Sequence, residues 1–342
     1  MALTKIKTGS VSDSITLTTP DINGGTVDAT VIGGTTPAVA TFTTASDAAG
    51  NVRSGRKNLI INGDMQVSQR GTSSTGNGYV SLDRWYSNQS GGSTTFTQET
   101  NTSPSQTSGI KSSARLNVSS SSNYTGINQK IEDVTSVPSG IVTLSFWAKG
   151  TVPVGGLYLN CSQDFGTGGS GDVNLSGILI TSSLTSSWVK YSTQITIPSV
   201  DGKTINAGSF FVFQINQGGN SSSTAYDLNI TGVQLEVGSV ATEFEHRSYG
   251  EELALCQRYY QIVEAHGRFR AAGGSHIYTN TVNYFVQMRA TPTATKSGGV
   301  VSNIGLEGVN SLTSRAFRYE LTNTSAGDAY QMGRIVSLEA EL

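Results

Sequence analysis

Tyrosine and arginine side chains near the C-terminal end of the sequence have the chemistry of a glycan-binding surface. A tyrosine ring is flat and amphipathic, and an arginine guanidinium offers a planar fork of donors, which suits hydroxylated or anionic sugars. The sequence offers Tyr278, Arg318, Tyr319 and Tyr330 for this role. Contacts between subunits use the same types of side chain. For each of these residues taken singly, a role in subunit packing is favoured over ligand contact.

Trp147 is a second candidate for ligand binding. It alternates with Leu144 and Phe146 along one predicted strand and therefore lies on the opposite face, where its ring would form a platform for a sugar. The alternative is packing under a loop or at a subunit contact, because aromatic residues in β-sandwiches are usually structural. We expect the other two tryptophans, Trp85 and Trp188, to belong to the core.

Paired carboxylates would be needed for glycan cleavage. The candidates are Glu132 with Asp133, Glu243 with Glu245, Asp164 and Asp172. An acid and a base must stand roughly 5 to 9 Å apart, which spacing along a sequence does not establish. The chain also lacks the short-period repeat of a parallel β-helix, so we expect no enzymatic activity and keep glycan depolymerase as the less favoured alternative.

The sequence does not predict a cofactor. Its three histidines, His246, His266 and His276, lack the spacing of a zinc site. Asp64 and Asp83 are weak candidates for a structural Ca²⁺, which carboxylates and backbone carbonyls bind in many β-sandwiches.

Composition narrows the classes of fold and function. The 342 residues include 24 acidic and 22 basic side chains, so the positive field that nucleic-acid binding requires is missing. Only 13% of residues are charged, 40 are Gly and about a quarter are Ser or Thr. This composition suits pleated strands and tight turns, and it predicts an all-β protein.

Neither a membrane span nor a secretion signal is expected. We find no run of the roughly 20 apolar residues that a spanning helix needs, and the N-terminal 25 residues lack a signal-peptide core. We therefore expect synthesis in a cytosol, without membrane insertion. The two cysteines, Cys161 and Cys256, fall in different predicted domains and are expected to be packed thiols.

Residues 1–56 contain few large side chains. A single copy cannot bury enough apolar surface to offset the entropy of ordering it, so the segment is either disordered or wound together with other copies. The stretch from Val31 to Thr44 resembles a short repeat in the stalks of trimeric bacteriophage tail fibres. This resemblance favours the second alternative and a role in docking to the virion.

Residues 57–247 show the period-two alternation of half-buried strands, as in Val142, Leu144 and Phe146. About ten or eleven short strands separated by Gly, Ser and Asn turns predict a two-sheet sandwich of the jelly-roll type. After Gly232 the apolar positions change parity, which predicts a glycine bulge within one strand.

Residues 248–342 are predicted to form a short helix followed by a small β domain. Ser248 and Glu251 have the spacing of a capping box. Leu253, Cys256 and Tyr260 then recur at helical spacing, with Leu255 and Tyr259 widening the face. Beyond the helix, three further apolar alternations indicate strands, the last of them lined by Met332, Val336 and Leu338.

Several segments occur in the order found in bacteriophage tail fibres and receptor-binding proteins. They are Asn58-Leu-Ile-Ile-Asn-Gly-Asp64, Asp83-Arg84-Trp85, Leu144-Ser-Phe-Trp-Ala-Lys149, Trp188-Val-Lys-Tyr191, Gly232-Val-Gln-Leu-Glu-Val-Gly238, Phe244-Glu-His-Arg-Ser-Tyr-Gly-Glu-Glu-Leu253, Cys256-Gln-Arg-Tyr-Tyr260, Met288-Arg-Ala-Thr-Pro-Thr293 and Glu339-Ala-Glu-Leu342. Over residues 57–342 the chain therefore resembles that family, whose sandwich is a jelly roll like those of carbohydrate-binding modules.

The resemblance implies a homotrimer in the virion tail, synthesised in the cytoplasm of the bacterial host. Residues 1–56 would dock on tail or adaptor proteins, 57–247 would form the carbohydrate-binding-like jelly roll, and 248–342 would serve receptor binding or trimerisation. Its partner would be a polysaccharide or lipopolysaccharide of the host surface. A purely structural fibre or decoration protein is the alternative.

Overall fold

The structure is a computed structural model that describes residues 57–100, 104, 109–119, 124–151, 155–217 and 225–342, together with the backbone of 46–47 and 50–51. Two short paired strands, β1 (Ser46–Asp47) and β2 (Gly50–Asn51), precede the main body. The rest of the predicted stalk, and with it the repeat-like stretch from Val31 to Thr44, lies outside the described residues. The described part is mostly β, as predicted.

Eleven strands between residues 57 and 247 build a two-sheet sandwich. The five-stranded sheet has the order β10 (Val173–Thr181), β9 (Leu157–Asp164), β12 (Phe210–Gln217), β7 (Tyr124–Glu132) and β4 (Tyr86–Ser90). The six-stranded sheet has the order β11 (Val189–Ile197), β8 (Gly140–Gly150), β13 (Tyr226–Val237), β6 (Ser112–Val118), β5 (Thr94–Thr100) and β3 (Ser73–Ser74). All these neighbours are antiparallel, and one 3-10 turn, η1 (Val134–Ser136), follows β7.

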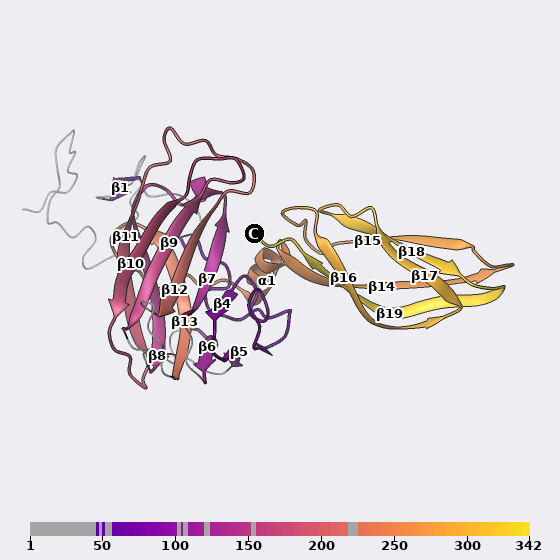
Figure 1. Ribbon diagram of the computed structural model, residues 1–342, viewed down its shortest axis with the longest axis horizontal. Helices are drawn as coiled ribbons and strands as arrows, with labels where there is room; N and C mark the ends of the chain where they lie inside the picture. The colour runs from indigo at the N-terminus through magenta and orange to yellow at the C-terminus, as the bar shows by residue number, and fades with distance from the viewer. Residues whose placement is uncertain are drawn as a thin grey trace, which may run out of the picture. The chain divides into compact units, whose positions relative to one another are not determined.

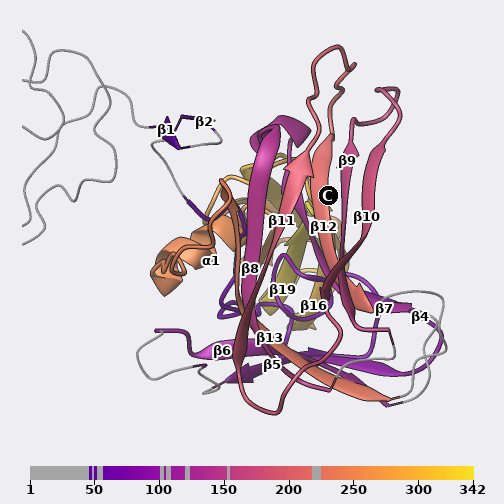
Figure 2. The same ribbon diagram turned by 90° about the vertical axis from the view of Figure 1, so that its left-hand side faces the viewer.

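The sandwich core lies between the two sheets, which Figure 2 shows as layers with β8 and β11 to the left of β12, β9 and β10. The predicted alternation is confirmed, since Leu144, Phe146 and Phe213 all point into this core. Trp85 is fully buried there and meets the ring of Phe213 edge-on. Trp188 was also predicted to be a core residue, but it precedes β11, is only half-buried and does not belong to this core.

The predicted bulge in β13 is confirmed. Its pairing with β8 shifts register between Thr231 and Gln234, and Gly232 has a φ of 60°. A side chain there would meet Ile110 and Trp147 at 2.8 and 3.1 Å, so glycine also permits close packing on this face. The bulge brings Val233 and Leu235 into the core although Ile230 already occupies it.

Helix α1 (Tyr249–Gln257) starts where the capping signal predicts, since the Ser248 hydroxyl accepts a hydrogen bond from the Glu251 backbone at 3.3 Å. It ends earlier than the predicted apolar face. Tyr260 is already the first residue of β14, where it pairs with Glu339, and Tyr259 lies between the two elements. Among the described residues, no helix is both long and apolar enough to cross a bilayer.

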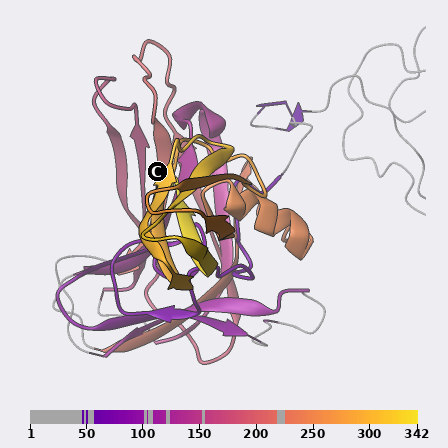
Figure 3. The ribbon, with the colours of Figure 1, turned by 90° about the vertical axis from the view of Figure 1, so that its right-hand side faces the viewer.

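Six strands follow α1 and form a pair of three-stranded sheets (Figures 1 and 3). One sheet contains β14 (Tyr260–Ala271), β19 (Gly327–Glu339) and β16 (Thr293–Ser302), and the other contains β15 (Ile277–Asn283), β18 (Ala316–Asn323) and β17 (Ile304–Asn310). Val336 and Leu338 enter their shared core as predicted, whereas Met332 is 55% exposed. The register of β19 against β14 shifts beside Gly333, whose φ is 66°, and this change of parity turns Met332 outward.

Two buried arginines of the sandwich, Arg70 and Arg84, join the sandwich to the last residues of the chain. Arg84 is 1% exposed and pairs with the Glu341 carboxylate, which Arg70 also contacts at 3.0 Å. Arg289 adds a hydrogen bond of 3.0 Å to the Glu341 carbonyl. Arg84, Arg289 and Glu341 come from segments that carry the resemblance to tail fibres, so part of that motif pattern has a structural explanation.

Both cysteines are buried free thiols, as expected. Burial raises the pKa of Cys161 to about 12, which keeps its thiol protonated at neutral pH.

Candidate functional site

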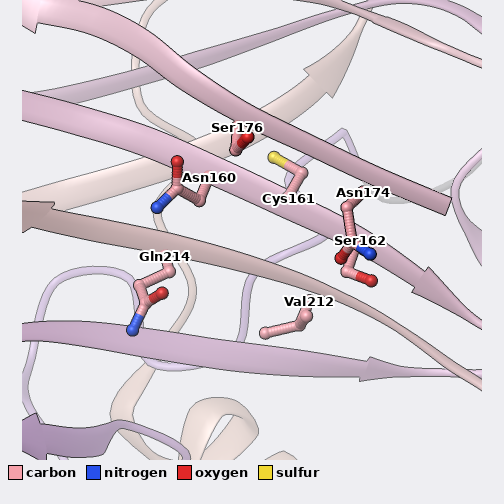
Figure 4. A pocket seen from close by; sticks show the side chains of 7 residues that line it. All are labelled: Asn160, Cys161, Ser162, Asn174, Ser176, Val212 and Gln214. Carbon is pink, nitrogen blue, oxygen red and sulfur yellow. The ribbon is translucent and has the colours of Figure 1, made fainter. Parts of the chain in front are cut away.

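The outward face of the five-stranded sheet holds a shallow pocket of about 360 Å³ (Figure 4). It arises from strand alternation, because Leu159 and Cys161 of β9 point into the core while Asn160 and Ser162 point outward. Neighbouring positions of β10 and β12 complete the lining, which consists of Asn160, Cys161, Ser162, Asn174, Ser176, Val212 and Gln214.

Antiparallel register sets the polar side chains in rows across the sheet. Ser162 lies opposite Asn174 on one side and Val212 on the other. In the next row, Asn160 lies opposite Gln214, which faces Asn128 of β7. Figure 4 shows Ser162 beside Asn174 and Asn160 beside Gln214. Amide side chains both donate and accept, so the rows present mixed hydrogen-bonding groups on a flat surface.

Asn160 is held in a defined orientation. Its Oδ1 accepts a hydrogen bond of 2.8 Å from the backbone of Gly177. Gly177 has a φ of 75° and lies where the pairing of β10 with β9 is irregular, between Leu175 and Ile178. A bulge in the edge strand thus orients a side chain of its neighbour.

Aromatic and amide groups continue the face beyond the pocket. The Tyr124 hydroxyl accepts a hydrogen bond from the Asn216 amide at 3.2 Å, and burial raises the pKa of that hydroxyl. Tyr158 lies opposite Asn216. Gly126 lies between these groups on β7, and a Cβ there would come within 2.7 Å of the Asn216 Cβ. The missing side chain lets Asn216 lie against the sheet.

The other end of the face is more charged. The Lys130 ammonium lies 4.1 Å from the centre of the Phe210 ring, and burial lowers its pKa. Glu132 accepts hydrogen bonds from Arg258 at 2.8 Å and from Tyr259 at 3.1 Å. This carboxylate therefore ties the sandwich to the residues that follow α1.

Another carboxylate considered for catalysis is also engaged. Glu245 accepts a hydrogen bond of 2.6 Å from the Asn58 backbone and lies 3.3 Å from Arg247. A carboxylate held by a guanidinium and a backbone amide serves structure, which leaves Glu245 poorly placed to act as a catalytic acid or base.

The candidates from the C-terminal domain do not converge. Arg318 lies on the outer face of β18, paired with Glu320 at 3.0 Å, whereas Tyr330 belongs to the other sheet, opposite Arg268. Tyr319 is fully buried, and its hydroxyl hydrogen-bonds Gln331 at 2.7 Å, so a surface ligand has no access to it. Tyr278 stacks on Phe269 with ring centres 5.6 Å apart.

Among the candidates from the C-terminal domain, Tyr278 lines a depression with a volume of about 370 Å³. Its lining is His266, Gly267, Arg268, Tyr278, Asn280, Gln331 and Met332.

The remaining candidates, Trp147, Asp83 and Asp64, are in contact with other residues of the protein. Trp147 is half-buried and lies close to Gly232 of β13, where an added Cβ would come within 3.1 Å of its ring. Asp83 accepts a hydrogen bond of 2.9 Å from the Gln69 backbone and faces Arg70. Burial raises the pKa of Asp64 to about 6, with the nearby Glu252 adding to the shift. Within the described ranges, no three His, Cys, Asp or Glu side chains gather as they do around a metal ion.

The sequence patterns predicted these strands but did not predict the rows of polar side chains on their outward faces. The apolar positions Phe211, Phe213 and Ile215 identified β12, and its alternate positions Gln214 and Asn216 carry the signal. Amides at the outward positions of several strands indicate a hydrogen-bonding face, but the order of strands in the sheet was needed to bring them together.

Searches for known relatives gave structures only. No protein-family model matches the chain, and no curated protein matches it. One similar structure is the enzymatically active domain of tailspike protein 4 from bacteriophage CBA120, at 16% identity and a TM-score of 0.33, covering 52% of this chain and 21% of that one. The matched half of this chain thus spans about a fifth of the length of the tailspike structure.

Two carbohydrate-binding modules are similar in fold. The CBM22-2 xylan-binding domain from Paenibacillus barcinonensis Xyn10C has 14% identity and a TM-score of 0.32, covering 45% of this chain and 91% of that domain. The N-terminal cellulose-binding domain of Cellulomonas fimi β-1,4-glucanase C has 16% identity and a TM-score of 0.29, covering 51% and 100%. These are distant β-sandwich similarities.

Proposed function

We propose that this chain is a non-enzymatic, carbohydrate-binding fibre protein of a bacteriophage tail, which adsorbs to host-surface glycan through the outward face of its five-stranded sheet. The observation that carries the binding proposal is the set of amide and hydroxyl rows around Asn160 and Gln214. Sugars present closely spaced hydroxyls that both donate and accept, and such rows complement them.

The tail-fibre part of the proposal is supported by the ordered motifs of the sequence. In this assignment residues 1–56 dock on a tail or adaptor protein, the sandwich is a jelly roll, and three chains assemble into the fibre. The site is shallow, and a shallow site binds weakly. Three weak sites on one fibre gain avidity whenever they engage the same cell surface together.

The competing assignments differ in what they require. A depolymerase needs a free acid and base, whereas Glu132 and Glu245 are engaged by arginines and hydrogen bonds. A purely structural fibre needs no polar pocket on the sheet, and the oriented amide of Asn160 favours the binding assignment over it.

The test is binding of the full-length protein to an array of bacterial lipopolysaccharides and capsular polysaccharides. We expect saturable binding to at least one glycan and its loss in the double variant Asn160→Ala/Gln214→Ala, while Arg318→Ala binds as the wild type does. Absence of binding across the array would favour the structural alternative. Release of reducing ends from a bound polysaccharide would instead identify a depolymerase.

A further inference from the structure

The six-stranded sheet has a polar depression of its own, on the opposite side of the sandwich. Its volume is about 310 Å³, and its lining is Lys149, Gly150, Thr151, Ser186, Asp227 and Asn229. This volume is near the lower end of the range for small-molecule sites, roughly 300 to 1,000 Å³. The depression therefore suits a single sugar ring rather than a long ligand.

Strand register brings the polar groups of the depression together. Asn229 of β13 lies opposite Lys149 of β8 on one side and Arg115 of β6 on the other, so the three side chains form one row on the outward face. Asp227 points the same way two residues earlier in β13.

Asp227 is fixed as an acceptor. Arg115 Nε donates to Oδ1 at 2.9 Å and to Oδ2 at 3.1 Å, and its Nη2 donates to Oδ2 at 2.5 Å. The Asn229 amide adds a long hydrogen bond of 3.5 Å to Oδ1, and Arg115 also reaches Glu99 at 3.4 Å. Bidentate pairing sets the plane of the carboxylate, and the Asp227 side chain remains 34% exposed beside the depression. Asp227 therefore presents oriented acceptors at the edge of the depression.

The rim of the depression is built from backbone that is locked in place. Gly150 has a φ of 130°, and a Cβ there would lie 1.9 Å from the Asp227 carbonyl oxygen, so only glycine fits. The Gly150 backbone donates to Thr185 at 2.8 Å, and the Thr151 backbone donates to Asp227 at 2.7 Å. The Thr151 hydroxyl accepts a hydrogen bond of 2.9 Å from the Asp227 backbone. These bonds preorganise the site and so reduce the entropy lost on binding.

Lys149 supplies a donor beside an aromatic ring. Its ammonium lies 4.9 Å from the centre of the Trp188 ring, within the range of a cation–π contact. Two cations, Lys149 and Arg115, stand near two anions, Asp227 and Glu99, so the depression has no excess charge with which to select an anionic ligand.

We infer that this depression is a second glycan site, which binds a neutral pyranose residue with two adjacent free hydroxyls. Asp227 accepts hydrogen bonds from the two hydroxyls, and Lys149 and Asn229 donate to their oxygens. The ligand class rests on the proposed glycan binding, but the residues are separate from those of the five-stranded sheet. Each sandwich would then engage glycan on both of its faces.

The test uses the full-length protein and the methyl glycosides of glucose, galactose and mannose as probes. Binding beside Lys149 displaces the ammonium from Trp188, so we expect a saturable change in tryptophan emission at millimolar sugar. Trp188→Phe removes this change. Losing one charged hydrogen bond weakens binding about tenfold, which we expect for Lys149→Ala. Lys111→Ala, a matched loss of an exposed lysine elsewhere, leaves binding unchanged.

The outcomes separate this site from the first one. The double variant Asn160→Ala/Gln214→Ala retains the Trp188 response even if it loses binding on the glycan array. If no methyl glycoside binds with saturation at tens of millimolar, or if Lys149→Ala and Asn229→Ala bind like the wild type, the second site does not exist, whatever the array shows.

Discussion

The guanidinium carbon of Arg84 lies 3.5 Å from the centre of the Tyr259 ring. A parallel contact lies beside it, with Arg70 at 3.7 Å from the Tyr260 ring. Guanidinium groups stack on aromatic faces while keeping their edges free for carboxylates, and Arg84 also pairs with Glu341. The Asp83-Arg84-Trp85 and Cys256-Gln-Arg-Tyr-Tyr260 segments therefore form parts of one buried junction.

Arg84→Ala is expected to destabilise the protein by about 3 to 5 kcal/mol, because it leaves the buried Glu341 carboxylate with less compensation. Arg318→Ala is the matched control, since its pair with Glu320 is exposed and contributes at most about 1 kcal/mol. Urea unfolding followed by circular dichroism measures both. Equal effects of the two substitutions would contradict a buried junction.

Asp64→Asn is expected to stabilise the protein at pH 8 by about 1 to 3 kcal/mol. Burial raises the pKa of Asp64 from 3.8 to about 6. Between these values the native state keeps the proton while the unfolded chain releases it, so wild-type stability falls as pH rises through this window. Unfolding at pH 3.5 and pH 8 should show a benefit of the variant only at the higher pH, and a benefit of equal size at both would refute the shift.

Gly126→Ala is expected to cost about 1 to 3 kcal/mol of stability, because the new methyl group collides with Asn216 and the Ile215 carbonyl. It should also weaken glycan binding on the five-stranded sheet by displacing Asn216. Gly171→Ala is the control, since nothing lies within 4 Å of its added Cβ. Thermal unfolding and array binding report the two effects, and unchanged values for both would contradict the packing described.

The proposed fibre should be a trimer in solution. Light scattering of the full-length protein is expected to give three times the chain mass of 35.9 kDa. Deleting residues 1–56 or 248–342 would show which end holds the chains together. A monomer at micromolar concentration would count against the shared-core account of residues 1–56.

Local patterns predicted the sandwich strands, the glycine bulge and the start of α1, because each depends on neighbouring residues. Leu144 and Phe146 mark a strand by alternation, and Ser248 marks a helix start by its hydroxyl. The end of α1 was not predicted, because Tyr260 leaves the helix to pair with Glu339, which is distant in sequence.

The candidate sites could not be predicted from local pattern. Asn160 and Gln214 are brought together by the order of β9 and β12, and Lys149 meets Asn229 only through the pairing of β8 with β13. Residue chemistry alone favoured Tyr319, but its alternation with Phe317 and Leu321 places all three in the core. Burial pattern was therefore the better guide than residue type.

The pairing of Arg84 with Glu341 joins residues that are 257 positions apart in the sequence. A ribosome adds about 5 to 20 residues per second, so Arg84 is synthesised roughly 13 to 50 seconds before its counter-charge. During that interval the Arg84 side chain lacks the Glu341 carboxylate that balances its charge. It must therefore stay in contact with water, and the part of the sandwich around it cannot close fully. We therefore expect the junction to close last during synthesis, after both sheets of the sandwich have paired.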